Sequence, residues 1–171
     1  MLFNECQTIS TISSNRFFKI NAIGCLIGII DLFDNNDNLK LESLVFNNMN
    51  YKVIDMDKLE ENFSRFYSRN KKKSMDLAFI IKSDNQFFTV ISELRLNYIN
   101  VSNLNLNSLK EKDKTSTRQS RLFNLPIHNE RYFIFKNDMK QQAINRLNRM
   151  NPKCPNNYKV KTPQELYDDF F

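Results

Sequence analysis

Glycine, cysteine, histidine and tryptophan are scarce in this sequence of 171 residues, which has two glycines, three cysteines, one histidine and no tryptophan. So little glycine argues against Gly-rich phosphate-binding loops, collagen and β-rich scaffolds with many tight glycine turns. The cysteines are odd in number, far apart and without a C-x-x-C pair, which argues against a disulfide framework or a tetrahedral zinc site. A single histidine excludes chemistry that needs two. We therefore expect reduced thiols in a cytoplasmic chain.

Long apolar runs are also missing. The first ten residues, MLFNECQTIS, contain no basic segment followed by an apolar one, so no signal peptide is predicted. The longest apolar stretch, residues 20–33, includes Asn21 and Asp31 and is too short to cross a bilayer. We expect no membrane partner.

The composition that remains is typical of a globular protein. Hydrophobic residues make up 41% of the chain and charged residues 26%, enough to bury a core within one domain. The net charge of +6 is uneven, because residues 1–62 have more acids than bases and residues 63–171 contain the whole excess of bases. This basic part predicts nucleic acid as a partner, with a solvated surface as the alternative reading. A protein partner and a homodimer stay open.

Helices and strands are expected to alternate in a mixed α/β (α+β) domain. The predicted helices are residues 57–67, the later part of 104–123, 138–150, and one that opens at Thr162 with a capping box. The predicted strands are residues 76–83, 86–96, 131–136 and 158–161.

The first third of the chain is harder to interpret. Residues 1–19 are polar and predict an irregular arm, while the apolar residues 20–33 fit a helix or a strand. Residues 34–38 have the composition of a turn, and extended pieces are expected near 39–46 and 51–54. We therefore treat residues 1–56 as an N-terminal extension of open structure.

The clearest element is a β-hairpin. β-branched and aromatic residues dominate residues 76–83 and 86–96, as is typical of strands, and the Asp84-Asn85 pair between them suits a two-residue turn. This turn makes Ser83 face Gln86 and sets the register of the whole hairpin.

Continued pairing along the hairpin places Asp76 opposite Glu93. Side chains alternate along a strand, so Glu93 and Arg95 point to the same face. Two opposed carboxylates repel each other unless a cation lies between them. That cation is either a divalent metal, for which Mg²⁺ has the right preference for carboxylate oxygens, or the guanidinium of Arg95. In a purely structural reading, the three side chains form an ion-paired triplet that holds a sheet edge.

Asp76, followed after the apolar strand by Glu93-Leu94-Arg95, resembles the motif of the PD-(D/E)XK, restriction-endonuclease-like nuclease superfamily. The resemblance covers residues 57–136 in the family's order of helix, strands, helix and strand. It implies a restriction-endonuclease-like core, a central mixed β-sheet flanked by helices, which residues 137–171 would complete. It also implies that Asp76 and Glu93 bind Mg²⁺.

Further roles follow from the same resemblance. The helix before the hairpin would supply an acid, Glu60 or Glu61, and we take Glu61 as the third metal ligand. Met75 stands where the family usually has proline, and Arg95 stands where it has the lysine that orients or activates the attacking water. Arginine stays protonated and cannot act as a base, but it could stabilise the pentacovalent phosphate.

Basic and polar residues near this motif are candidates for binding the nucleic-acid backbone. They comprise a loop directly before Asp76 and two residues on the following helix: Arg69, Lys71, Lys72, Lys73, Arg118 and Gln119. A solvated loop and a solubilised helix surface explain the same residues without any partner.

The sequence thus predicts a metal-dependent nuclease whose catalytic residues are Asp76, Glu93 and Arg95. One alternative is the same fold without catalysis, acting as an immunity or protein-binding module of a bacterial conflict system. A further alternative is a non-catalytic nucleic-acid-binding protein.

Overall fold

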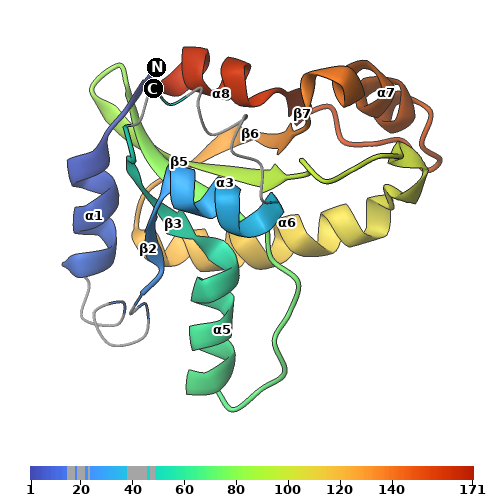
Figure 1. Cartoon of the computed structure of the whole chain (residues 1–171). Helices are drawn as coiled ribbons and strands as arrows, with labels where there is room; N and C mark the ends of the chain where they lie inside the picture. Colours follow the sequence, from blue (N-terminus) through green and yellow to red (C-terminus); the bar gives the residue numbers. More distant parts are fainter. Residues whose placement is uncertain (15–17, 19–21, 23, 38–45, 47–48) are drawn as a thin grey trace.

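The computed structural model describes residues 1–14, 18, 22, 24–37, 46 and 49–171. These residues form a mixed α/β architecture in which helices flank a seven-stranded sheet (Figure 1). Among them, no helix combines the length and the apolarity that crossing a membrane requires. The expected α+β fold class is confirmed.

The sheet is antiparallel in its first part and parallel in its last. Its strand order is β2-β3-β4-β5-β6-β7, and β1 pairs with β4. The strands are β1 (Leu2–Phe3), β2 (Leu26–Gly28), β3 (Lys52–Asp55), β4 (Leu77–Ser83), β5 (Gln86–Leu94), β6 (Ile127–Ile134) and β7 (Tyr158–Lys161). The pairings from β2 to β5 are antiparallel, whereas β5, β6 and β7 run parallel to one another.

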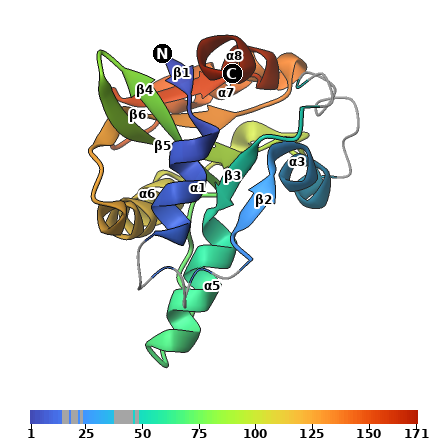
Figure 2. The same ribbon diagram turned by 90° about the vertical axis from the view of Figure 1, so that its left-hand side faces the viewer.

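Helices cover both faces of this sheet. They are α1 (Glu5–Ser13), α3 (Ile29–Asp37), α5 (Met56–Phe66), α6 (Leu106–Ser120), α7 (Asn137–Asn148) and α8 (Pro163–Phe170), with short 3₁₀ turns at Val101–Asn103 and Arg121–Phe123. Figure 2 shows α3 and α6 on opposite sides of the sheet. Apolar side chains of α3 and α8 pack on one face, and those of α1, α5, α6 and α7 pack on the other.

Alternate side chains of the two hairpin strands point into different cores, one on each face of the sheet. Leu77 and Phe79 of β4 point into the α3–α8 core, whereas Ala78 between them points to α1 and α5. In β5, Val90 and Ile91 divide in the same way. Away from the turn, both hairpin strands are thus covered on both faces.

The prediction of an irregular arm over residues 1–19 is wrong for residues 2–13, which form β1 and α1. Asn4 caps α1, its side chain accepting a hydrogen bond from the Gln7 amide, and its own amide donates to the Ile80 carbonyl at 2.8 Å. The Ile80 amide in turn donates to the Thr8 hydroxyl at 3.0 Å. These contacts satisfy the stretch of β4 edge between the pairings of β1 and β3.

Residues 20–33 contain a strand and a helix in succession, which explains why a single periodicity does not describe them. β2 ends at Gly28 and α3 begins at the next residue. The turn predicted for residues 34–38 is wrong up to Asp37, because α3 continues through that residue. The extended piece expected near residues 39–46 lies outside the described residues except for Phe46, which is buried between α3 and α8.

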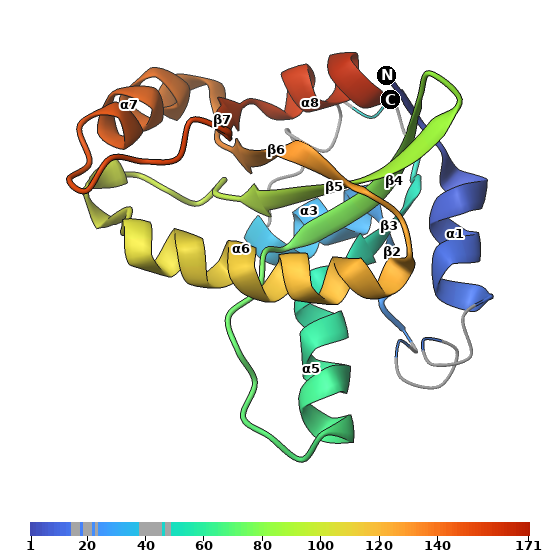
Figure 3. The ribbon, with the colours of Figure 1, turned by 180° about the vertical axis from the view of Figure 1, so that it is seen from behind.

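From residue 51 onward, the predicted elements are present, most of them with small shifts of their ends. Two predictions are wrong in extent: the strand expected at residues 131–136 already begins at Ile127, and the helix expected only in the later part of residues 104–123 already begins at Leu106. The helix α8 has the expected capping box between Thr162 and Glu165, with proline at its first turn. β5, α6 and β6 form a crossover between parallel neighbours, and Figure 3 shows α6 lying across the sheet. This crossover places α6 beside the end of the hairpin.

Candidate functional site

The hairpin has the register that the sequence predicts. Asp84 and Asn85 both adopt positive φ angles, 48° and 64°, as the two-residue turn requires. Ser83 pairs with Gln86, and the ladder continues without a shift to Leu77 and Ser92. The next position brings Asp76, just before β4, to Glu93 on β5.

Asp76 is fixed by the neighbouring strand. Its Oδ2 accepts a hydrogen bond from the Leu94 amide at 2.7 Å, and its side chain is 18% exposed. Its other oxygen, Oδ1, lies 3.8 Å from the Lys112 ammonium. One oxygen is therefore engaged by the backbone, and the other faces the cation.

Glu93 is almost completely buried, with a side chain that is 1% exposed. Its Oε1 accepts a hydrogen bond from Lys112 Nζ at 2.5 Å and forms an ion pair with Arg95 Nη2 at 2.7 Å. Its Oε2 is buried and has no hydrogen-bond partner among the described residues. A buried carboxylate oxygen without a partner is costly, and a bound cation would remove that cost.

Arg95 shares a face with Glu93, as alternation predicts, but it does not lie between the two acids. Its guanidinium pairs with Glu93 on one side and donates to the Tyr98 hydroxyl at 2.8 Å on the other. It also stacks over the Tyr98 ring, 5.0 Å from the centroid. Arg95 therefore flanks Glu93 and is tied to the segment after β5.

The cation between the carboxylates is Lys112, which is not among the site residues predicted from the sequence. It lies on α6, and its ammonium is within 4 Å of both Asp76 and Glu93. A signal for it exists in the sequence. Leu109, Ser116 and Gln119 form the buried stripe of α6, and Lys112 falls in that stripe at helical spacing.

The three-ligand metal set of Asp76, Glu93 and Glu61 is not assembled. Both carboxylate oxygens of Glu61 are used on α5 itself, by Lys58 and Arg65. Within the described residues, no three acidic, histidine or cysteine side chains cluster as a metal site. Asp76 and Glu93 are therefore two potential metal ligands without a third acid beside them in the described part of the chain.

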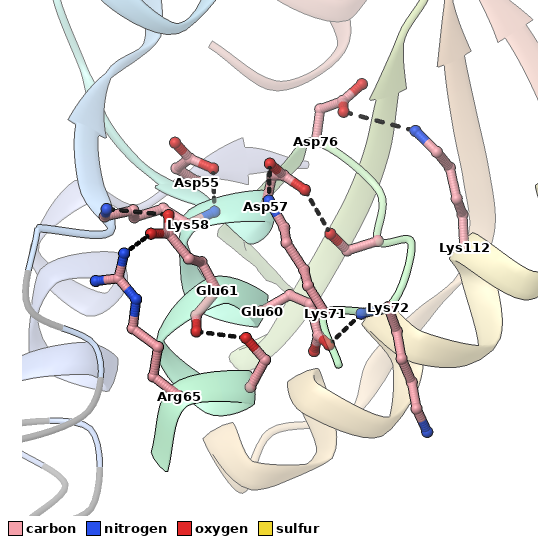
Figure 4. Close-up of polar contacts among 12 residues, drawn as sticks. Asp55, Asp57, Lys58, Glu60, Glu61, Arg65, Lys71, Lys72, Asp76 and Lys112 are labelled. Atoms are coloured by element: carbon pink, nitrogen blue, oxygen red, sulfur yellow. Dashed lines mark hydrogen bonds and ion pairs between the residues drawn. The ribbon is translucent and has the colours of Figure 1, made fainter. Parts of the chain in front are cut away.

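The other acids of α5 behave differently from each other (Figure 4). Glu60 is fully buried and binds Arg69, the Lys72 amide and the Gln119 side chain, so it joins α5, the following loop and α6. Asp57 pairs with Lys71 at 2.5 Å. Burial chiefly raises the pKa of Asp76, and the charge of Asp57 adds to this.

The predicted nucleic-acid-binding residues fall into two groups. Four of them already bind acidic side chains. Arg69 and Gln119 bind Glu60, Lys71 pairs with Asp57, and Lys73 pairs with Glu111 at 3.5 Å. The other two, Lys72 and Arg118, are exposed and make no ion pair with any described residue. Only this second group has its charge available for a phosphate.

The donor set of the carboxylate pair fits a hard divalent cation. Two carboxylates with water and phosphate oxygens are a common environment for Mg²⁺, and the buried Oε2 of Glu93 supplies an unused donor. Burial chiefly raises the pKa of Glu93 to about 8, the Asp76 charge adds to this, and Arg95 and Lys112 offset part of it. Burial likewise raises the pKa of Asp76. In the metal-free fold, Lys112 and Arg95 therefore offset only part of the effect of burial on these two carboxyl groups.

We expect the raised pKa of Glu93 to affect how the stability of the protein depends on pH. The folded-state pKa of Glu93, about 8, lies above the ordinary value of 4.5, so the folded protein holds this proton more tightly than the unfolded chain. The resulting stabilisation is complete below pH 4.5 and is lost as the pH rises to about 8. In EDTA, the melting temperature of the wild type should therefore fall more steeply over this range than that of Glu93→Gln. Parallel profiles for the two proteins would contradict this prediction.

The site thus consists of two carboxylates from adjacent strands, a lysine from the crossover helix and an arginine that supports one carboxylate. Such a set can bind a cation and an anionic oxygen side by side. No protein-family model, curated protein or solved structure matches this chain.

Proposed function

We propose that the protein is a metal-dependent nuclease of the PD-(D/E)XK kind, which hydrolyses phosphodiester bonds of DNA or RNA. The observation that carries this proposal is the meeting of Asp76 and Glu93 around the Lys112 ammonium, with Glu93 Oε2 left unpartnered. The order of α5, the β4–β5 hairpin, α6 and the parallel strand β6 supports it, because the sequence resemblance implies that order.

In this proposal Asp76 and Glu93 hold Mg²⁺. When bound, such an ion stabilises negative charge on the phosphate as a Lewis acid. Lys112 is a compact charge on a flexible stem and takes the place of the family's lysine, binding a phosphate oxygen or a water beside the carboxylates. Arg95 keeps Glu93 oriented through its ion pair and its contacts with Tyr98.

A second candidate function has one observation in its favour. In the metal-free fold, Glu93 Oε1 is already paired with two cations, Lys112 and Arg95, as in a static ion-paired network. This favours a catalytically inactive nuclease fold that acts as an immunity or protein-binding module.

A cleavage assay with metal controls distinguishes the two functions. The purified chain is incubated with end-labelled single-stranded and duplex DNA, RNA and supercoiled plasmid, in Mg²⁺, Mn²⁺, Ca²⁺ or EDTA. We expect cleavage of at least one substrate in Mg²⁺ or Mn²⁺ and none in EDTA, because the carboxylates need the cation to act on a phosphate. Calorimetry with Mn²⁺ alone should show binding at one site.

Two results would overturn the proposal. One is that every substrate stays intact with every metal, which leaves the inactive fold as the better interpretation. The other is cleavage that persists in EDTA, which would place the chemistry outside the carboxylate pair. Glu93→Gln, purified in parallel, serves as the control for contaminating nucleases.

A further inference from the structure

A cavity of about 580 Å³ lies between α5 and α6, on the side of α6 next to Lys112. Side chains from α5, from the loop that leads to Asp76, and from α6 line it, among them Tyr67, Lys72, Lys114, Arg118 and Leu122. We propose that this cavity binds single-stranded nucleic acid, with an unpaired base against Tyr67 and Leu122 and the phosphates on Lys72, Lys114 and Arg118. The inference names the substrate class of the proposed nuclease and in that sense rests on the proposed function.

Charge is the first argument. Lys72, Lys114 and Arg118 are exposed, and none of them forms an ion pair within the part of the chain that the structure describes. The nearby Lys71 and Lys73, by contrast, are paired with Asp57 and Glu111. The two acids in the lining, Glu60 and Glu111, are paired with Arg69 and Lys73. The three cations without such a pair attract a polyanion, and phosphates are the anions spaced along a nucleic-acid chain.

The apolar lining is the second argument. Tyr67 is 56% exposed and Leu122 42% exposed, and both line the cavity, with Phe63 beneath them. The Tyr67 ring is held edge-on by Phe66, 4.9 Å between centroids. An aromatic face beside unpaired cations is the combination that binds bases and backbone of a single strand. The base pairs of a duplex are stacked on one another and offer no free face to such a ring.

Contacts of one buried acid connect the elements that line the cavity. Buried Glu60 binds Arg69, the Lys72 amide and Gln119, and it therefore fixes α5, the loop and α6 relative to one another. In Figure 4 the Lys72 side chain points away from Glu60. A preformed cavity loses little conformational entropy when a ligand binds.

Its position fits the substrate of the carboxylate pair. Lys114 and Arg118 are on the same helix as Lys112, and the loop that carries Lys72 runs directly into Asp76. Asp76, Glu93 and Lys112 do not line the cavity, but a strand that leaves it along α6 or along this loop would reach them. The cavity would hold nucleotides next to the scissile phosphate.

Fluorescence anisotropy in EDTA tests this without any cleavage. Labelled 20-nucleotide DNA and RNA strands are compared with a duplex of the same sequence, for the wild type, Lys72→Ala/Arg118→Ala and Tyr67→Ala. The matched control is Lys82→Ala/Lys153→Ala, which removes the same charge from exposed residues outside the cavity. Circular dichroism confirms that all four proteins are folded.

We expect single strands to bind at least about tenfold more tightly than the duplex, as stacking on an aromatic side chain predicts. Lys72→Ala/Arg118→Ala should weaken binding at least about tenfold and reduce the salt dependence by about 1.4 in slope. Tyr67→Ala should weaken single-strand binding about tenfold and leave duplex binding unchanged. The single strand that binds more tightly, DNA or RNA, shows which of the two nucleic acids the cavity prefers.

Equal binding of duplex and single strand, or an equal loss in the control variant, would overturn the inference. Because no metal is present, these results do not depend on catalysis. Single-strand binding by a chain that fails the cleavage assay would leave the cavity assignment standing and remove only the nuclease proposal.

Discussion

Replacing Glu93 by glutamine should reduce metal-dependent cleavage at least about 100-fold, while the metal-free protein keeps its stability. Residues that only orient a metal ligand already contribute about 10–100-fold to metal affinity or activity. Loss of the charge of a ligand itself should therefore reduce cleavage by a larger factor. Glutamine has nearly the same volume and can still accept a hydrogen bond from Lys112. The substitution removes a buried carboxylate whose Oε2 has no partner in the described part of the chain, and it also removes the repulsion between this charge and Asp76.

The two readouts together separate a metal ligand from a structural ion pair. If Glu93 mainly held Lys112 and Arg95 in place, breaking this buried network by removing one partner would destabilise the fold by about 3–5 kcal/mol. If Glu93 is a metal ligand, the variant should lose Mn²⁺ binding in calorimetry and keep its melting temperature. A variant that unfolds at lower temperature and still binds Mn²⁺ would contradict our assignment.

Glu61→Gln is the matched control, because it is the same substitution at an acid of α5. Glu61 pairs with Lys58 and Arg65 on its own helix and does not reach the carboxylate pair. We expect unchanged cleavage and at most a small change in stability, since helix-surface pairs contribute about 0.3–0.5 kcal/mol each. A loss of cleavage in Glu61→Gln would bring back the three-ligand site that the sequence predicted.

The sequence alone was sufficient for the hairpin, and the reason is local. A two-residue turn fixes the register of both strands, so the pairing of Ser83 with Gln86 determines every pair down to Leu77 and Ser92. The meeting of Asp76 and Glu93 follows from that register. No information from the rest of the chain is needed.

Lys112 and Glu61 show where local reasoning ends. Which acid of α5 faces Asp76 depends on how the helix is rotated against the sheet, and that is set by the buried Leu59 and Phe63. Glu60 lies on the buried side but is used by Arg69 and Gln119. The position of Lys112 depends in the same way on the packing of α6 against β5 and β6, which joins segments about twenty residues apart.

The N-terminal residues were missed for a different reason. The polar side chains of α1 do not show an apolar stripe, because the buried positions of this helix include Thr8 and Thr11. Thr8 is buried because its hydroxyl accepts a hydrogen bond from the Ile80 amide at the edge of β4. A hydrogen bond to the sheet, rather than an apolar contact, therefore decides which face of α1 is inside.

Lys112→Met should lower the rate of cleavage about 10²–10³-fold, the cost of removing one preorganised group that stabilises transition-state charge. Methionine keeps the length and apolar stem of lysine and loses only the ammonium. Because that ammonium now competes for the oxygens of Asp76 and Glu93, Mn²⁺ should bind the variant at least as tightly as the wild type. In this variant the rate of cleavage should therefore fall while the affinity for Mn²⁺ stays the same or rises.

Arg95→Lys tests the other cation of the site. A lysine at this position restores the residue that the sequence resemblance expects, but it loses the stacked contact with Tyr98. We expect cleavage to fall less in this variant than in Lys112→Met, because Arg95 acts on Glu93 rather than on the substrate. Lys110→Met, an exposed residue of the same helix α6, should cleave like the wild type.

The division between kcat and KM decides which role Lys112 has. A group that contacts the reacting phosphate mainly in the transition state lowers kcat when it is removed, whereas one that only attracts the substrate raises KM. Lys112 is 19% exposed and lies between the two carboxylates, whereas the cations that would attract a strand, Lys72 and Arg118, line the neighbouring cavity. We therefore expect Lys112→Met to lower kcat and Lys72→Ala/Arg118→Ala to raise KM. The reverse pattern would place the reacting phosphate in the cavity and leave the carboxylate pair without a substrate.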